Sequence, residues 1–325
     1  MSESDFRVAL LSDLDLEISA NAKRLAHFIA DAFGENTAAV LHYGSHLHSG
    51  DLRPTSAYDF FVLLDDESEA FRSFTRAVQP RFTAHTAARL SRVLPPSIIG
   101  VNTDGEAGAA PIRGKCAVMS VRSFQAACGP SAKDHFTKGR LFQPVRLAWV
   151  RDEQNRRIVG KALLDARTGT LSWARPALPP RFTVEQYCRT LLTTSYAGEI
   201  RAEKNTRPLE VFEAKREVLV ALYSAVLQKL EIDGLLRSES RLYRLASPVS
   251  QFERARVELY FRRSKVRAMA RWGKSIVLYD RWLDYLREKA ERRTGTAIEL
   301  SQRERRWPLI FLWPKAVRVL TATRR

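Results

Sequence analysis

The sequence predicts an α/β (α+β) protein, in which a sheet domain is followed by a mostly helical domain and a C-terminal amphipathic segment. Three observations predict it. Short apolar runs alternate with helical patterns as far as residue 168, which is typical of a sheet covered by helices. Prolines gather in 173–182, which predicts a linker, and the periodicity beyond it is helical. We therefore expect domains over 1–168 and 183–300, the second with a winged-helix-like arrangement as one option, and a separate segment over 301–325.

The composition favours two domains with an anionic partner. The chain has 325 residues and 45% hydrophobic content, which is ample for more than one buried core. Residues 1–150 carry 16 Lys and Arg and 16 Asp and Glu, so the whole net charge of +17 lies beyond residue 150. A basic second half indicates binding to nucleic acid or to an anionic membrane surface, and composition does not choose between them.

Targeting and cysteine patterns predict a cytoplasmic protein. No apolar run approaches the length that spans a bilayer. The N-terminus is acidic and resembles neither a secretory signal nor a transit peptide. Cys116, Cys128 and Cys188 are widely spaced and match no zinc or disulfide pattern, which fits a reducing compartment.

The first domain is predicted element by element from apolar periodicity and its breaks. Leu14–Phe33 has a helical apolar face and ends at Gly34. Strands and helices then alternate, with a loop predicted over 102–114 and a polar turn over 134–139. We expect strands at Ala38–Leu41, Tyr58–Leu64, Ser97–Val101, Lys115–Val121 and Pro144–Val150, and helices at Glu67–Val78, Thr83–Leu94 and Asp152–Thr168.

The second domain is predicted to be mostly helical. Val184, Tyr187, Leu191 and Tyr196 fall on one helical face. Further helices are expected at Val211–Leu230, Phe252–Tyr260 and Trp272–Glu291.

Residues 38–66 contain the residues best suited to chemistry. Gly44 and Ser45 follow the first predicted strand, and such a turn can direct backbone N–H groups and a hydroxyl at a phosphate. Asp59 opens the next strand, where a carboxylate is costly unless it is paired or binds a metal. The pattern therefore indicates a nucleoside triphosphate at Gly44 and Ser45, with Mg²⁺ on Asp59. The alternatives are an ordinary turn with a capping Ser and an Asp at a solvated strand edge.

A second ligand for the metal is harder to assign. Asp65 lies six strand residues beyond Asp59, which is roughly 20 Å and too far to share an ion. Asp51, in the loop before Asp59, is a candidate, and substrate phosphates are another source of ligands. His42, His46 and His48 cluster around the turn but have no evident fourth partner for zinc.

The Gly-Ser turn followed by Asp59 resembles the DNA polymerase β-like nucleotidyltransferase core. Ala57 stands where most members of that superfamily carry the first Asp of a pair. The mitochondrial-type phosphatidate cytidylyltransferases, also called the translocator assembly and maintenance family, share this departure. Their strand has a similar layout, with Asp-Phe and then an apolar run ending in Asp-Asp, as in Asp59-Phe60 and Asp65-Asp66.

Three later segments resemble the same family in the same order. They are Asn102 with Lys115–Ser120, Gly139–Arg146 and Ser195–Arg201. The resemblance implies that the nucleotide site includes Lys115, Arg140, Tyr196 and Arg201. Without the resemblance, Lys115 would be an exposed lysine at a strand end, and Arg140 would be similar. Tyr196 and Arg201 would belong to a solvated helical face. Glu199 replaces the family's Asp and is one methylene longer.

The resemblance implies a phosphatidate cytidylyltransferase of phospholipid biosynthesis. Such an enzyme transfers CMP from CTP to phosphatidate, releases pyrophosphate and forms CDP-diacylglycerol. Asp59 would be the catalytic, Mg²⁺-binding carboxylate, with Asp51 as a second candidate ligand. The resemblance also implies a peripheral protein on the inner, cytoplasmic membrane leaflet, with no nucleic acid partner.

The C-terminal segment fits a membrane-associated role. Trp307 and Trp313 flank large apolar residues, with cations on both sides, as in interfacial helices. The alternative is a terminal segment packed on the helical domain. For the whole chain, two further hypotheses stay open: a nucleotidyltransferase with another acceptor, such as RNA or a soluble phosphate, and a non-catalytic nucleotide-binding descendant.

Overall fold

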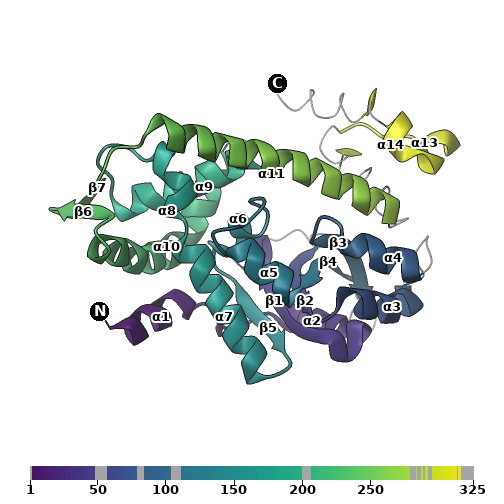
Figure 1. Cartoon of the computed structure of the whole chain (residues 1–325). Coiled ribbons are helices and arrows are strands. Elements are labelled where there is room, and N and C mark those ends of the chain that lie inside the picture. Colours follow the sequence, from purple (N-terminus) through teal and green to yellow (C-terminus); the bar gives the residue numbers. More distant parts are fainter. Residues whose placement is uncertain are drawn as a thin grey trace.

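The computed structural model describes most of the chain and shows a mixed α/β architecture. It describes residues 2–47, 57–78, 84–103, 111–199, 206–278, 295–312 and 314–315, and Leu283, Arg287, Ala290 and Glu291. The predicted fold class is confirmed at this level: a five-stranded mixed sheet and a second, small sheet are combined with many helices (Figure 1).

The main sheet has the strand order β3-β4-β2-β1-β5. Strands β2 and β4 are parallel, and the other neighbours are antiparallel. The strands span Thr37–Tyr43 (β1), Tyr58–Leu64 (β2), Ser97–Thr103 (β3), Ile112–Ser120 (β4) and Arg146–Val150 (β5). The predicted β2 is confirmed residue for residue, and the others differ at their ends by a few residues.

Helices cover both faces of the sheet, which explains why β2 is apolar on both sides. Phe61, Leu63 and Ala117 face a core with α5–α7. Phe60 and Val62 face a core with α2–α4. These helices span Ala20–Phe33 (α2), Glu67–Val78 (α3), Ala84–Ser91 (α4), Val121–Cys128 (α5), Lys138–Leu141 (α6) and Glu153–Thr168 (α7).

The N-terminal helix α1 (Glu3–Leu11) was not predicted. It packs into the hydrophobic core of the helical domain and not into the cores on either side of the sheet. The side chain of Ser2 accepts a hydrogen bond from the N–H of Asp5 and begins the helix. Phe6 and Leu10 are buried in the helical core. The helix predicted over 14–33 begins only at Ala20, because Ser19 caps it there.

The helical domain packs around α9 and α10, and the stretch 173–182 lies inside it. Trp173 and Phe182 are buried in this core, so the stretch predicted as a linker is packed within the helical part of the molecule. The burial of these two side chains holds the stretch in the core, although its prolines locally favour a loop. The elements are α8 (Leu171–Ala174), η3 (Arg175–Ala177), α9 (Val184–Gly198), α10 (Arg207–Ile232) and the hairpin β6–β7 (Leu236–Glu239 and Leu242–Leu245), which was not predicted.

Helix α11 (Gln251–Leu278) joins the two parts of the molecule. It runs past the helical domain and across the sheet domain as far as β3 (Figure 1). It unites the predicted helix 252–260 with the start of the one predicted over 272–291, of which residues 279–282, 284–286, 288 and 289 lie outside the described residues. The short helices α13 (Gln302–Arg306) and α14 (Pro308–Phe311) follow. Among the described helices, none combines the length and apolarity that a membrane crossing needs.

His42 of β1 is a buried imidazole that makes the fold sensitive to acid. It is 1% exposed, and neither ring nitrogen has a hydrogen-bond partner among the described residues. Its ring lies 5.1 Å from that of Phe60, centroid to centroid. Burial lowers the pKa of His42 from 6.5 to about 3, with smaller effects from His46 and Arg146. The folded state therefore disfavours protonation of this ring.

We expect replacement of His42 by Phe to reduce the loss of stability in acid. The unfolded chain binds the proton below pH 6.5 and the folded chain only near pH 3, so His42 destabilises the fold as the pH falls through that window. Between pH 7.5 and 5.0 the wild type should lose at most about 2 kcal/mol more than H42F. Urea unfolding measures this. The exposed His27 gives the control H27F, which should lose as much stability as the wild type. If H42F lost as much stability in acid as the wild type, His42 would not be the cause.

Candidate functional site

Two predicted site residues, Asp59 of β2 and Lys115 of β4, meet near the end of β1. In the sheet register, Asp59 lies opposite Tyr43 of β1 and opposite Lys115 of β4. Lys115 Nζ is 4.0 Å from Asp59 Oδ1. The side chains of Asp59 and Lys115 are 25% and 30% exposed, so both remain accessible to a ligand. The structure thus places a carboxylate and an ammonium together, although 56 positions separate them in the sequence.

Gly44 lies directly beside Asp59. Its φ is +92°, a region that side chains disfavour. A Cβ built on Gly44 would lie 2.6 Å from Asp59 Oδ2, so only glycine leaves room for the carboxylate. Ser45 follows at the start of the turn η2 (Ser45–Leu47), half-buried. The backbone of the Gly-Ser turn, the serine and Asp59 therefore share one corner of the sheet.

The electrostatics of this corner link it to Arg140. Burial raises the pKa of Tyr43, the charge of Asp59 raises it further, and Arg140 opposes the shift. Tyr43 therefore lies within electrostatic range of both residues. It stays a neutral phenol whose ring packs 4.7 Å from that of Phe61.

The donor set fits Mg²⁺ that shares its ligands with a bound triphosphate. Asp59 supplies an accessible carboxylate, and Mg²⁺ is usually held by one or two carboxylates together with substrate phosphates and water. The described residues contain no group of three or more His, Cys, Asp or Glu side chains arranged to hold a metal. Asp51, the other predicted ligand, lies outside the described residues.

Arg140 of α6 lies at the junction of the two domains and is held there by several contacts. Its Nη1 donates to both carboxylate oxygens of Glu199, each at 3.1 Å, and to the carbonyl of Phe136 at 2.6 Å. Its guanidinium carbon lies 3.7 Å from the ring centroid of Phe136. Its side chain is 18% exposed. The predicted role of Arg140 at a phosphate stays a prediction, and it would require exchange of some of these contacts.

The two segments that carry Arg140 and Glu199 pack tightly on each other. A Cβ at Gly139 would lie 2.4 Å from Glu199 Oε1 and 2.9 Å from Ser195 Oγ. Tyr196 is half-buried against the helical core. Arg201 lies outside the described residues. The segments 139–146 and 195–199, which contain residues predicted to bind the nucleotide, are therefore neighbours in space. The sequence alone does not place them together.

We expect Gly139→Ala to destabilise the fold and separate these segments. The added methyl group would meet Glu199 and Ser195 below contact distance, and such overpacking costs about 1–3 kcal/mol. Urea unfolding measures the change. Gly100 of β3 is the matched control, since a Cβ there meets nothing within 4 Å, so G100A should keep or raise stability. Equal stabilities of the two variants would contradict the close packing at Gly139.

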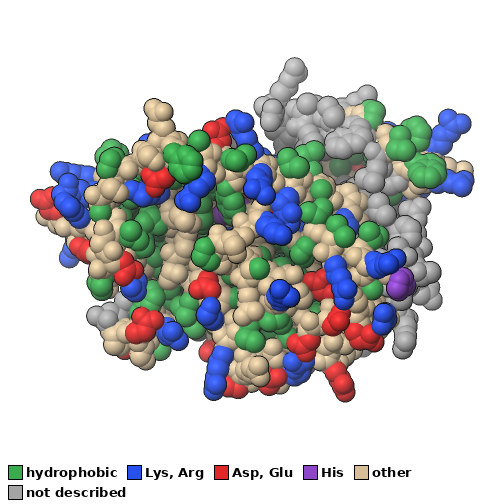
Figure 2. All heavy atoms as spheres, in the orientation of Figure 1, with side chains coloured by type: hydrophobic (Ala, Val, Ile, Leu, Met, Phe, Trp, Pro, Cys, Tyr) green, Lys and Arg blue, Asp and Glu red, His purple; other side chains and the backbone are tan. Residues whose placement is uncertain are grey.

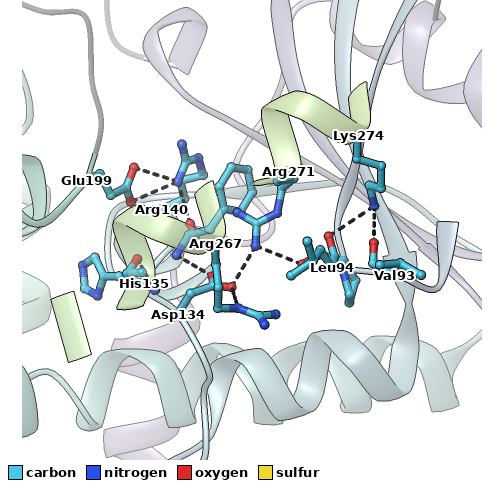
Figure 3. A network of polar contacts seen from close by, with 12 residues as sticks. Val93, Leu94, Asp134, His135, Arg140, Glu199, Arg267, Arg271 and Lys274 are labelled. Carbon is cyan, nitrogen blue, oxygen red and sulfur yellow. Dashed lines mark hydrogen bonds and ion pairs between the residues drawn. The ribbon is translucent and has the colours of Figure 1, made fainter. Parts of the chain in front are cut away.

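A polar network that sequence reasoning missed fastens α11 beside this site (Figure 3). Asp134 Oδ2 accepts from Arg267 Nε and from Arg271 Nη2, each at 2.8 Å. Lys274 Nζ donates to the carbonyls of Val93 and Leu94 at 2.7 and 3.2 Å. Burial lowers the pKa of Lys274 to about 7. Only the cationic pattern of α11 could have signalled these contacts, because their acceptors lie far away in the sequence.

The ring of Phe136 connects this network to Arg140. The guanidinium carbon of Arg271 lies 4.7 Å from the centroid of the same ring that Arg140 covers. Phe136 also packs edge-on against Phe61 of β2, with centroids 6.2 Å apart. The strand that bears Asp59 is thus connected through packed side chains to the helical domain.

Comparison with known proteins adds no assignment. No family model matches the chain, and no curated protein is significantly similar to it.

Proposed function

We propose that this chain is a nucleotidyltransferase that transfers CMP from CTP to phosphatidate. The observation that carries the proposal is the meeting of Gly44, Asp59 and Lys115 at one corner of the sheet, at 4.0 Å between the charged groups. The sequence resemblance to the phosphatidate cytidylyltransferases supports the choice of nucleotide and acceptor.

Each residue of the corner has a role in binding the triphosphate. The backbone of Gly44, free of a side chain, allows a phosphate to approach, and the hydroxyl of Ser45 donates to its oxygens. The ammonium of Lys115 neutralises phosphate charge. Asp59 would hold Mg²⁺, and the ion would supply stabilisation of the charge that develops on the leaving pyrophosphate.

The acceptor requires no strong general base. A phosphate oxygen of phosphatidate is already anionic, and it attacks the α-phosphorus of CTP as the bond to the β-phosphate oxygen breaks. Pyrophosphate leaves with that electron pair, and CDP-diacylglycerol remains. Catalysis then depends on positioning and on charge stabilisation, which the corner residues supply.

A lipid acceptor agrees with the character of the C-terminal part of the chain. Trp307, Ile310 and Phe311 are 55%, 64% and 46% exposed, next to Arg303, Arg305 and Arg306. Exposed aromatic and aliphatic side chains beside cations favour a peripheral position on an anionic leaflet. Trp313 and residues 316–325 of the predicted membrane segment lie outside the described residues.

Pyrophosphate release tests the proposal. The protein is incubated with CTP and Mg²⁺, with and without phosphatidate in mixed micelles. We expect release that depends on phosphatidate and falls when ATP or GTP replaces CTP. Release with another acceptor would overturn the lipid assignment, and no release with any acceptor would favour the non-catalytic alternative.

A further inference from the structure

The exposed side of α11 carries four large apolar side chains beside its charged residues. Phe252, Leu259, Val266 and Met269 are 76%, 56%, 66% and 48% exposed. Among the described residues of α11, the buried side chains Ser264, Arg271 and Ser275 are polar, and Tyr260 and Phe261 are half-buried against the helical core. A surface helix usually shows the reverse pattern. Packing against the described part of the chain therefore does not explain these four apolar side chains.

The four side chains lie along one side of the helix, with Arg262 between Leu259 and Val266. Phe252, Leu259 and Val266 are seven residues apart, which is close to two helical turns, and Met269 follows one turn later. The span of 17 residues corresponds to about 26 Å of helix. Ala255 and Ala270, also exposed, lie on the same side. We call Phe252, Leu259, Val266 and Met269 the apolar stripe.

Cations flank the apolar stripe. Helix α11 contains eight Lys and Arg and only two Glu. Arg256, Arg262, Arg263 and Lys265 are exposed. Glu258 is paired with Arg262 at 2.6 Å, and Glu253 accepts from Arg175 at 2.8 Å. Figure 2 shows hydrophobic side chains along the upper rim over α11, with Lys and Arg among them, and a second hydrophobic group over α13–α14.

We propose that the exposed side of α11 docks on an anionic phospholipid bilayer. The apolar stripe enters the boundary between headgroups and acyl chains, and the flanking cations bind lipid phosphates. Helix α14, which contacts α11 and exposes Ile310 and Phe311, extends the same apolar and basic surface. This inference deepens the proposed function, since it adds a folded helix of the enzyme to the membrane contact of its C-terminal segment.

Charge and side-chain type disfavour the other occupants. A second copy paired along α11 would bring two strongly basic helices together, and like charges close to each other are destabilising. A nucleic acid would place Leu259 and Val266 against phosphates, where they offer neither hydrogen bonds nor base stacking. An anionic lipid surface fits both features of α11, because its hydrocarbon can contact the apolar stripe and its phosphates can bind the cations.

Vesicle flotation of the full chain without nucleotide tests the docking surface. We expect binding to phosphatidylcholine vesicles that contain phosphatidylglycerol and weak binding without it. The variant F252S/L259S/V266S should bind at least about tenfold more weakly. The matched control V8S/L209S/I232S removes three exposed apolar side chains, of 68%, 50% and 70% exposure, from α1 and α10, and it should bind as the wild type does.

The charge contribution has its own pair of variants. Arg256→Glu with Arg263→Glu should weaken binding by at least about tenfold, since each cation near an anionic surface contributes measurably. Arg157→Glu with Lys161→Glu on α7 changes the net charge equally and should bind as the wild type does, because these side chains, 79% and 75% exposed, lie off the proposed surface. All variants should keep the wild-type melting curve.

Insertion is measured directly by fluorescence. The three native cysteines are buried, so an environment-sensitive dye on Leu259→Cys labels α11 selectively. A blue shift with anionic vesicles is expected for Leu259→Cys and not for Ile232→Cys on α10.

Several results would overturn the proposal. They are absence of vesicle binding, unchanged binding of the apolar stripe variant, equal loss in the control variants, and binding to poly(U) RNA in place of vesicles. Because no nucleotide is present, these outcomes are independent of pyrophosphate release, so failure of the docking surface and failure of the proposed reaction are distinguishable.

Discussion

Replacement of Asp59 by Asn is expected to lower CMP transfer by about a thousandfold or more. The substitution keeps the size of the side chain and removes the negative charge that would hold Mg²⁺ beside Lys115. Metal ions contribute several kcal/mol of charge stabilisation in phosphoryl chemistry, which corresponds to about this factor. Pyrophosphate release with CTP, Mg²⁺ and phosphatidate measures the rate.

The same strand supplies the control for Asp59. Asp65 follows the other end of β2 and is paired with Arg151 at the protein surface. D65N should therefore transfer CMP at the wild-type rate, and both variants should unfold at similar urea concentrations. If D59N retained activity within a few-fold of D65N, Asp59 would not be the metal-binding carboxylate.

Strand β2 could be predicted fully because one local signal decides it. The run from Phe60 to Leu64 is apolar without interruption, and it is buried between two helical layers. A strand in that position has no polar face, so the apolar run locates the strand and its end, and Tyr58 and Asp59 precede the run within the strand. The adjacent Asp59 interrupts the pattern, and this exception identified the candidate site.

The elements that were missed depend on contacts with distant parts of the chain. In 173–182 the prolines indicate a loop, and only the assembled helical core shows that Trp173 and Phe182 are buried. In α1 the helical signal is short, and Phe6 and Leu10 gain their environment from helices more than 150 residues away. Local patterns do not contain this information.

In the candidate site, too, local neighbours could be predicted and contacts between distant segments could not. Gly44 and Asp59 could be placed together because their strands are consecutive and pair as a hairpin would. The contact of Arg140 with Glu199, and that of Asp134 with Arg271, join segments 59 and 137 positions apart. The sequence predicted several of these residues as functional but could not show which of them are neighbours.

The ion pair between Asp13 and Arg167 is buried and fully bonded. The two side chains are 1% and 0% exposed. Arg167 Nη1 and Nη2 each donate to one carboxylate oxygen of Asp13 at 2.7 Å, and Asp13 Oδ2 also accepts from the N–H of Val145. Arg167 further donates to the carbonyls of Leu10, Leu141 and Gln143. The pair therefore connects the N-terminal segment, α7 and the residue that precedes β5.

Asp13→Asn is expected to destabilise the fold by about 3–5 kcal/mol. The change leaves the Arg167 guanidinium buried without a counter-charge, and an uncompensated buried charge costs about this much. Urea unfolding at neutral pH measures the loss. Asp15, two residues on, is the matched control, because its side chain is 61% exposed and pairs with Arg156 at the surface, so D15N should change stability by less than about 1 kcal/mol.

A double variant separates the charge from the packing at this position. If the buried charge causes the loss, Asp13→Leu with Arg167→Met should be less destabilised than the sum of its single variants, since Arg167 and its carboxylate partner are then removed together. Additive losses would mean that the hydrogen bonds of Arg167 to the carbonyls matter more than its charge. In that case Arg167→Met alone should destabilise the fold more than Asp13→Asn, because three backbone acceptors would lose their donor while the carboxylate keeps the N–H of Val145.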